Sequence, residues 1–310
     1  MAISAGLARR YCRNRRNRPF REVSVPGQLK VAVIGLGSMG SGIASSLLRA
    51  GHPVTGGSAF ATPAEAVDDA DVTIVVALND AQTEAVLFGP DGAVGAMRPG
   101  GVVISSATMP PASARSFAAR AAQSGIHYLD APISGGSVKA EAGKLTVMAS
   151  GSPEAFRAVR PVLNAIAETV YELGEEAGIG AAFKIVNQLL AGVHIAAACE
   201  AITFAVELGL DINRVFEVIT KSAGNSRMFE NRVPHVLDGD YSPRSAISIF
   251  TKDLGIVTEL GRMEHFPLPS ASSALQLFIM AEATGMGGDD DASVARLFAD
   301  IAGVHLPKGT

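Results

Sequence analysis

The stretch "KVAVIGLGSMGSGIASSLLRAG", residues 30–51, decides the fold of this 310-residue chain. An apolar run of strand length ends in glycine, and a helical pattern follows it as far as Gly51, a natural helix stop. Gly35, Gly37 and Gly40 have G-x-G-x-x-G spacing, which provides a tight turn, a close backbone approach to a pyrophosphate, and close helix–strand packing. The sequence therefore predicts a dinucleotide-binding turn that also includes Leu36, Ser38 and Met39.

Buried strands and helices alternate after this turn. The runs 71–78 and 100–107 are rich in β-branched residues without polar alternation, as expected for strands covered on both faces of a parallel sheet. Helical patterns at 80–88 and 110–125 separate the strands, and "IHYLDAPIS", "KLTVMASG" and "ETVYELG" add further short strand segments. This alternation predicts an α/β doubly wound domain over residues 30–180.

The composition changes after residue 180. Residues 179–210 contain no proline and only three charged side chains, Lys184, Glu200 and Glu207, which predicts a long helix buried on most sides. Further helical patterns, joined by turns rich in Gly, Pro and Asp, follow it. We therefore expect residues 181–310 to form an all-α domain.

Composition and charge narrow the classes of partner. With 48% hydrophobic residues, 18% charged residues and a net charge of −4, the chain is globular and has no basic surplus for nucleic acid or an anionic membrane. Its two cysteines lie far apart without metal-ligand spacing, so neither a disulfide framework nor a metal site is expected. Its apolar runs are interrupted before they reach membrane-spanning length, so we expect no transmembrane helix.

The N-terminal extension has its own composition. Residues 1–21 contain seven arginines and no acidic residue. A mitochondrial transit peptide has this composition, but a disordered basic extension or an overextended translation start explains it as well. We therefore exclude residues 1–29 from the fold and expect a cytoplasmic protein, with the mitochondrial matrix as the alternative.

The second strand ends abnormally. About 20 residues after such glycines, a dinucleotide-binding fold normally has an acid for the ribose of NAD or a basic residue for the phosphate of NADP. Here "HPVT" runs into Gly56 and Gly57, and neither kind of residue is present. A Gly-Gly pair between "PVT" and "SAFA" favours a two-residue hairpin over a crossover helix, so the second βα crossover is expected to be shortened.

Four motifs in order resemble those of the β-hydroxyacid dehydrogenase family. They are the glycine turn, "DAPISGGSVKAEAGKLTVMASG" (130–151), "KIVNQLLAG" (184–192) and "FTKDLG" (250–255). The resemblance implies a Rossmann-type sheet followed by an all-α domain similar to that of 6-phosphogluconate dehydrogenase. Within the family, "QLLAGVHIAAACEA" and "AGNSRMFENRVPHVLDGDY" look most similar to L-threonate dehydrogenases.

The resemblance also implies roles for individual residues. Ser134, Gly135 and Gly136 match a turn that binds the substrate carboxylate, and a glycine-rich turn does expose several donors to one anion. Lys184 matches the catalytic lysine, and burial would depress the pKa of its ammonium and suit it to proton transfer. Asn187 and Gln188 share its helical face and would hold the substrate hydroxyl. The alternative for residues 134–136 is an ordinary turn without a ligand. The alternative for Lys184 is a lysine that extends to solvent from the edge of a helix.

Three more residues are predicted to lie near the cofactor. Lys252 matches a lysine that reaches the site from the second domain, although a surface lysine paired with an acid would look the same. Asn79 follows a buried strand, where a parallel sheet presents its cofactor edge. The family commonly has Thr or Ser where this chain has Ala107, which leaves Ser106 as the polar candidate there.

Together these residues imply an NAD(P)-dependent oxidoreductase acting on a small hydroxy acid. The leading expectation is oxidation of L-threonate to 2-oxo-tetronate with NAD, or with NADP, in a homodimer or homotetramer without metal. A 3-hydroxyisobutyrate dehydrogenase or a tartronate or succinic semialdehyde reductase is the alternative within the family. A non-catalytic relative that has lost tight cofactor binding with the shortened crossover is the alternative from another class.

Overall fold

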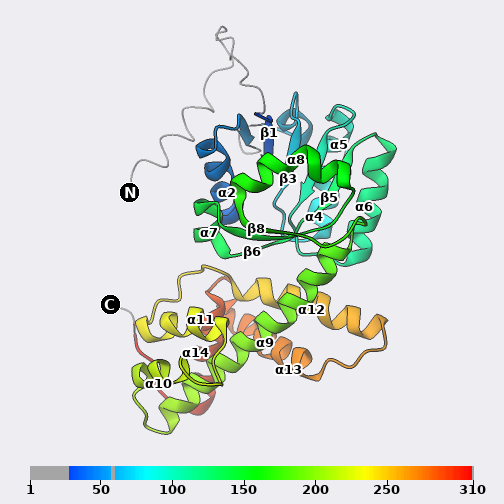
Figure 1. Ribbon diagram of the computed structural model, residues 1–310. Coiled ribbons are helices and arrows are strands. Elements are labelled where there is room, and N and C mark those ends of the chain that lie inside the picture. The colour runs from blue at the N-terminus through cyan, green and yellow to red at the C-terminus, as the bar shows by residue number, and fades with distance from the viewer. Residues whose placement is uncertain (1–27, 57–59, 309–310) are drawn as a thin grey trace.

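The computed structural model describes residues 28–56 and 60–308. Figure 1 shows two parts joined by one long helix, a sheet with its helices above and a helical half below. All strands of the described residues precede Ile179, and only helices follow it. The fold class is therefore as predicted. The domain boundary at residues 180/181 stays a prediction.

A five-stranded parallel sheet forms the first half. Its order is β2-β1-β3-β4-β5, which places β1 (Val31–Ile34) between β2 (Val54–Gly56) and β3 (Val72–Val75). β4 (Val102–Ser105) and β5 (His127–Asp130) continue the sheet. β1, β3 and β4 are buried along their whole length, which explains their unbroken apolar sequences.

Helices cover both faces of this sheet. One face packs against α2 (Ser38–Arg49) and α8 (Pro153–Ile166). Residues of α4 (Asp80–Phe88), α5 (Ala93–Ala96) and α6 (Pro111–Gln123) contribute to the core on the other face, together with Val67, which directly follows α3 (Pro63–Ala66). A second small sheet, β6-β7-β8, follows β5 and consists of β6 (Ile133–Ser134), β7 (Leu145–Ala149) and β8 (Ala167–Glu172).

The junction at Gly56 differs from the predicted hairpin. Val31, Ala32 and Val33 of β1 pair in parallel with Val54, Thr55 and Gly56 of β2, so β2 keeps the normal edge position of a βαβ unit. Phe60 and Ala61 are in no strand, and the chain returns to β3 through the four-residue helix α3. Gly56 of the predicted hairpin thus lies in a parallel strand, whereas Gly57 and residues 58–59 lie outside the described residues. The shortened crossover stays a prediction.

A short helix, α7 (Gly136–Ala142), ties the second sheet to the glycine turn. It packs against α2 at Gly42, where a Cβ would lie 2.7 Å from the main-chain nitrogen of Glu141 and 3.0 Å from Ala140 Cβ. The absence of a side chain at Gly42 lets the two helices approach this closely. The turn that starts α7 and the turn that starts α2 are thus held at a fixed spacing.

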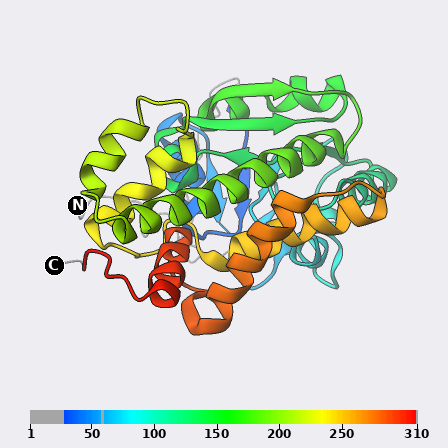
Figure 2. The same ribbon diagram turned by 90° about the horizontal axis from the view of Figure 1, so that it is seen from below.

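The helical half is built around α9 (Ile179–Glu207), which was predicted over residues 179–210. Figure 2 shows α9 crossing the helical half, flanked by the other helices. These are α10 (Ile212–Ile219), α11 (Arg227–Asp238), α12 (Ile247–Met263), α13 (Pro269–Ala281), a π-helical extension (Glu282–Met286), a 3₁₀ turn (Asp291–Ser293) and α14 (Val294–Ala302). By length and composition alone, α9 could cross a membrane, but its buried side lies in the core of this half.

A carboxylate from the sheet holds the first turn of α9. Asp130 at the end of β5 accepts hydrogen bonds from the main-chain nitrogens of Gly178 (2.9 Å) and Ala181 (2.8 Å), and Ser150 Oγ accepts one from Gly180 (2.9 Å). These are donors that a helix N-terminus leaves without partners. Burial raises the pKa of Asp130 to about 6, although the hydrogen bonds it accepts act in the opposite direction. The long helix is thereby fixed to the sheet at its start.

Candidate functional site

A side chain at each of the three glycines of the turn would have a different steric effect. Gly35 has φ +95°, and a Cβ there would overlap the carbonyl oxygen of Val76, the residue after β3. A Cβ on Gly40 would overlap the carbonyl oxygen of Gly35, so this glycine allows the helix to pack against the strand end. A Cβ on Gly37 would meet nothing within 4 Å, so the second glycine borders open space. That pattern is the one predicted for a turn approached by a pyrophosphate.

The start of α2 is open to a ligand. Gly35, Gly37 and Ser38 are exposed, Leu36 and Met39 are half-buried, and no side chain caps the helix at Gly37. A helix N-terminus with uncapped donors favours an anion. The residues present therefore fit the pyrophosphate of a dinucleotide.

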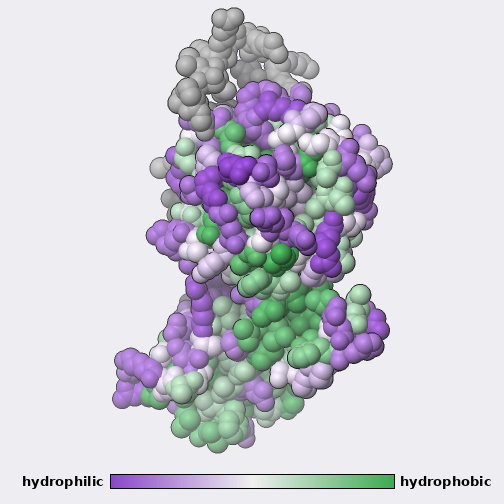
Figure 3. Space-filling model, turned by 45° about the vertical axis from the view of Figure 1, so that its right-hand side comes forward, coloured by the Kyte–Doolittle hydropathy of each residue, from purple (hydrophilic) through white to green (hydrophobic). Residues whose placement is uncertain are grey.

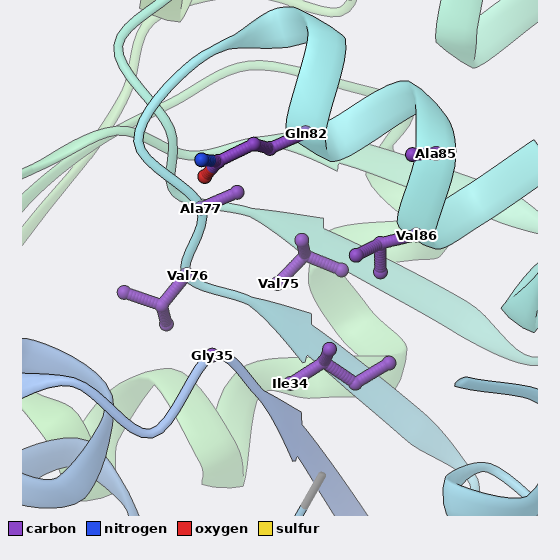
Figure 4. Close-up of a pocket in the computed structure, with 8 residues that line it drawn as sticks. All are labelled: Ile34, Gly35, Val75, Val76, Ala77, Gln82, Ala85 and Val86. Atoms are coloured by element: carbon purple, nitrogen blue, oxygen red, sulfur yellow. The ribbon is translucent and has the colours of Figure 1, made fainter. Parts of the chain in front are cut away.

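An apolar hollow lies beside the turn, between the ends of β1 and β3 and helix α4. It measures about 280 Å³, and Figure 4 shows Gln82 and Val86 of α4 facing the strand ends. Its lining residues are Ile34, Gly35, Val75, Val76, Ala77, Gln82, Ala85 and Val86. Gln82 was not predicted as a site residue. Asn79 lies at this edge, as expected, but its side-chain oxygen caps α4 by accepting a hydrogen bond from Gln82 N (2.8 Å).

The end of β2 contributes no charge to this edge. A Cβ on Gly56 would lie 2.7 Å from Leu36 Cδ1, so a side chain at this position would point at the glycine turn. β2 ends on the residue without one. In the described part of the chain, the end of β2 therefore provides neither the acid nor the base that selects between the two nicotinamide cofactors.

The predicted substrate turn is formed by Ser134, Gly135 and Gly136. Gly135 and Gly136 have φ angles of +138° and +73°, which disfavour residues with a Cβ. Both are exposed, Ser134 is half-buried, and the space next to a Cβ at Gly136 is open. The turn thus presents backbone and hydroxyl groups to solvent at the start of α7.

Lys184 lies directly beside this turn. Its side chain is 8% exposed, and its Nζ donates a hydrogen bond to the carbonyl oxygen of Ile133 (2.8 Å), the residue before Ser134. Burial lowers the pKa of Lys184 from 10.5 to about 8; the charge of Asp253 raises it and that of Lys252 lowers it further. A lysine with this pKa can exchange a proton near neutral pH.

The two amides after Lys184 form a chain. Asn187 Nδ2 donates to Gln188 Oε1 (2.9 Å), and Gln188 Nε2 donates to Asp253 Oδ2 (2.5 Å). Asp253 on α12 was not predicted, although it stands next to Lys252 in the quoted motif. Its carboxylate is 1% exposed and also pairs with Lys252.

Lys252 connects the helical half to the end of β4. Its Nζ lies 3.5 Å from the carbonyl oxygen of Thr108, and its side chain is half-buried. Ser106 is buried at the same strand end, and its hydroxyl has no hydrogen-bond partner in the described part of the chain. Ala107 beside it is also buried and offers no polar group. Buried hydroxyls in proteins nearly always have a hydrogen-bond partner, so this one marks the edge as a candidate contact with a bound ligand.

The structure thus connects the predicted residues through contacts at the carboxyl ends of the strands. Lys184 donates a hydrogen bond to Ile133, directly before the Ser134 turn, and Gln188 donates one to Asp253 on α12. Lys252 contacts the carbonyl oxygen of Thr108, shortly after β4. The glycine turn and Asn79 flank the adjoining edge. Within residues 28–56 and 60–308, no group of three or more His, Cys, Asp or Glu side chains is arranged to hold a metal ion.

Two family models match the two halves of the chain. Residues 30–59 and 55–174 match the NAD binding domain of 6-phosphogluconate dehydrogenase, in two pieces that overlap at residues 55–59. Residues 178–298 match the model described as NAD-binding of NADP-dependent 3-hydroxyisobutyrate dehydrogenase. The first match is therefore broken at the end of β2.

Relatives match over nearly the whole chain. An L-threonate dehydrogenase of Cupriavidus necator is 49% identical over 292 residues, which is 89% of this chain and 97% of that protein. A Salmonella typhimurium crystal structure named 3-hydroxyisobutyrate dehydrogenase is 44% identical with a TM-score of 0.83, covering 87% of this chain and all of that one. Psf3, in complex with NADP+ and 2-OPP, is 26% identical with a TM-score of 0.79, covering 86% and 99%. With these matches, this chain belongs to the NAD(P)-dependent β-hydroxyacid dehydrogenase family.

Proposed function

We propose that this enzyme oxidises L-threonate to 2-oxo-tetronate. The observation that carries the chemistry is the buried Lys184 amine beside the Ser134 turn, because a proton acceptor and an anion-binding turn then adjoin. The choice of substrate is supported by the 49% identity to an L-threonate dehydrogenase. The Salmonella protein, at 44% identity, is named for another hydroxy acid, so 3-hydroxyisobutyrate is the second candidate.

The proposal assigns the site residues to substrate binding, to orientation of the hydroxyl, or to proton transfer. Ser134 and the main-chain N–H groups of Gly135 and Gly136 bind the substrate carboxylate. Asn187 and Gln188 orient the hydroxyl, and neutral Lys184 takes its proton as the C–H hydride leaves the same carbon. NAD(P), when bound, accepts that hydride. The Gly35–Gly40 turn would hold its pyrophosphate, with Asn79, Ser106 and Lys252 beside it.

The pKa of Lys184 fixes the pH dependence of this reaction. Because that pKa is lowered to about 8, the lysine becomes a proton acceptor as the pH rises through this value. We expect kcat for L-threonate oxidation to rise between about pH 7 and 9, and the reverse reduction, which needs the protonated lysine, to fall there. Lys184→Ala should reduce kcat by about 10²- to 10⁴-fold in both directions. Full turnover with an unchanged pH profile in this variant would remove Lys184 as the base.

Turnover of several hydroxy acids tests the assignment of L-threonate as the substrate. L-Threonate, 3-hydroxyisobutyrate and glycerate are compared by kcat/KM with each cofactor, following the appearance of the reduced nicotinamide. The proposal expects the highest value with L-threonate. A higher value with 3-hydroxyisobutyrate would support the second candidate, and wild-type protein that turns over none of them would support the non-catalytic alternative.

Because β2 ends at Gly56, without a charged side chain, we expect the enzyme to discriminate only weakly between NADH and NADPH. With no acid at Gly56 to repel a phosphate and no base to bind it, NADH and NADPH should bind with affinities within about tenfold of each other. Gly56→Asp should shift the preference toward NADH, because its side chain would point at the turn. Fluorescence titration of both reduced cofactors measures this, and a wild-type preference well above tenfold would contradict it.

We also propose that the enzyme is a homodimer through one face of α9. Phe183, Val186 and Leu190 are 53%, 61% and 49% exposed and recur at the helical spacing of one face, and Phe204 continues it. Figure 3 shows an apolar surface where the two halves meet and another at the far end of the helical half. An exposed apolar stripe of this length favours a protein interface.

The dimer is tested by placing a charge in the stripe. Leu190→Arg should yield monomers in light scattering after gel filtration, because the partner would have to bury an unpaired guanidinium. The matched control is Val138→Arg, since Val138 is an exposed apolar residue on α7 in the other half of the molecule. A wild-type monomer at micromolar concentration, or dissociation caused by both variants, would contradict the proposal.

A further inference from the structure

Asp253 has no role in the proposed reaction, yet it contacts two of the residues assigned to the site, Gln188 and Lys252. Its carboxylate comes from α12 and accepts the Gln188 hydrogen bond from α9 at 2.5 Å. Its other oxygen pairs with Lys252, which reaches the end of β4. The group is 1% exposed, so neither contact is exchanged for water.

These contacts fix the direction of the amide chain. An ionised carboxylate only accepts hydrogen bonds, so Gln188 must turn its NH₂ group toward Asp253 and its oxygen toward Asn187. Asn187 must then donate with its own NH₂ group, as it does at 2.9 Å. One hydrogen of the Asn187 NH₂ group then remains, and it can donate to the oxygen of the reacting hydroxyl, whose own single hydrogen goes to Lys184.

The charge of the Asp253 carboxylate also acts on the Lys184 amine. Asp253 and Lys252, both on α12, are the charged side chains that act on the Lys184 amine, and the Ser134 turn contributes only the neutral carbonyl of Ile133. Asp253 raises the pKa of Lys184 and Lys252 lowers it. Because the surroundings are buried, a single negative charge has a large effect there.

We propose that Asp253 is a positioning residue that sets both the direction of the Gln188–Asn187 amide chain and the electrostatic environment of Lys184. The proposal rests on the proposed function for the assignment of Asn187 to the substrate hydroxyl. One acid on α12 thereby couples the base, the hydroxyl-orienting amides and the lysine at the cofactor edge.

The test is the titration of Lys184 in Asp253→Asn. Limited acylation of the full-length protein with acetic anhydride across a pH series, with Lys184 quantified by mass spectrometry, gives the midpoint of this lysine without any turnover. We expect the midpoint to fall by about one pH unit or more when the neighbouring charge is removed. The control is Glu259→Gln on the same helix, which removes an exposed acid paired with Arg262 and should leave the midpoint unchanged.

Kinetics of the same variants separate positioning from a general loss of structure. Asp253→Asn should raise KM for the hydroxy acid several-fold and move the kcat profile to lower pH, while circular dichroism and the melting temperature confirm folding. Asp253→Ser replaces it if the Asn variant does not fold. An unchanged Lys184 midpoint in a folded variant overturns the proposal. If wild type turns over no hydroxy acid, the proposed function fails, and the acylation midpoint still decides the role of Asp253.

Discussion

The architecture depends on the bond between Asp130 and the first turn of α9. A 29-residue helix that starts at the sheet and ends in the far half can place a side chain reproducibly only if its start is fixed. Two main-chain nitrogens bind one carboxylate oxygen, and a third binds Ser150, whose backbone pairs with that of Asp130. Removal of the carboxylate would leave two buried donors unpaired, at a cost of about 1–3 kcal/mol each.

The position of Lys184, the proposed base, follows from this attachment. Lys184 stands one turn beyond the bound nitrogens, where its amine donates a hydrogen bond to Ile133, directly before the Ser134 turn. That turn begins α7, and α7 packs on α2 through Gly42, so Lys184, the Ser134 turn and the Gly35–Gly40 turn share one framework. Burial within it lowers the pKa of the amine to about 8.

Features set by local sequence could be predicted, whereas features set by distant partners could not. The buried strands, α9 and the Gly35–Gly40 turn follow from periodicity and glycine spacing, and Lys184 is conspicuous because a charge interrupts an apolar helix. Asp130 and Asp253 lie inside motifs that were recognised, but their partners are 51 and 65 residues away along the chain, so nothing local indicates their contacts. The parallel pairing of β2 with β1 is likewise a contact with a strand distant along the chain, which the Gly-Gly pair at Gly56 does not indicate.

Hydrogen exchange at the start of α9 measures whether Asp130 fixes this helix to the sheet. In Asp130→Ala, peptides covering residues 178–184 should lose protection while those covering Ile195 to Ile202 in the helical core keep it, and turnover should fall with the loss. Asp130→Asn, which keeps an acceptor oxygen, should behave nearly as wild type. Unchanged protection of residues 178–184 in Asp130→Ala would show that the carboxylate does not fix the helix, and would contradict the account.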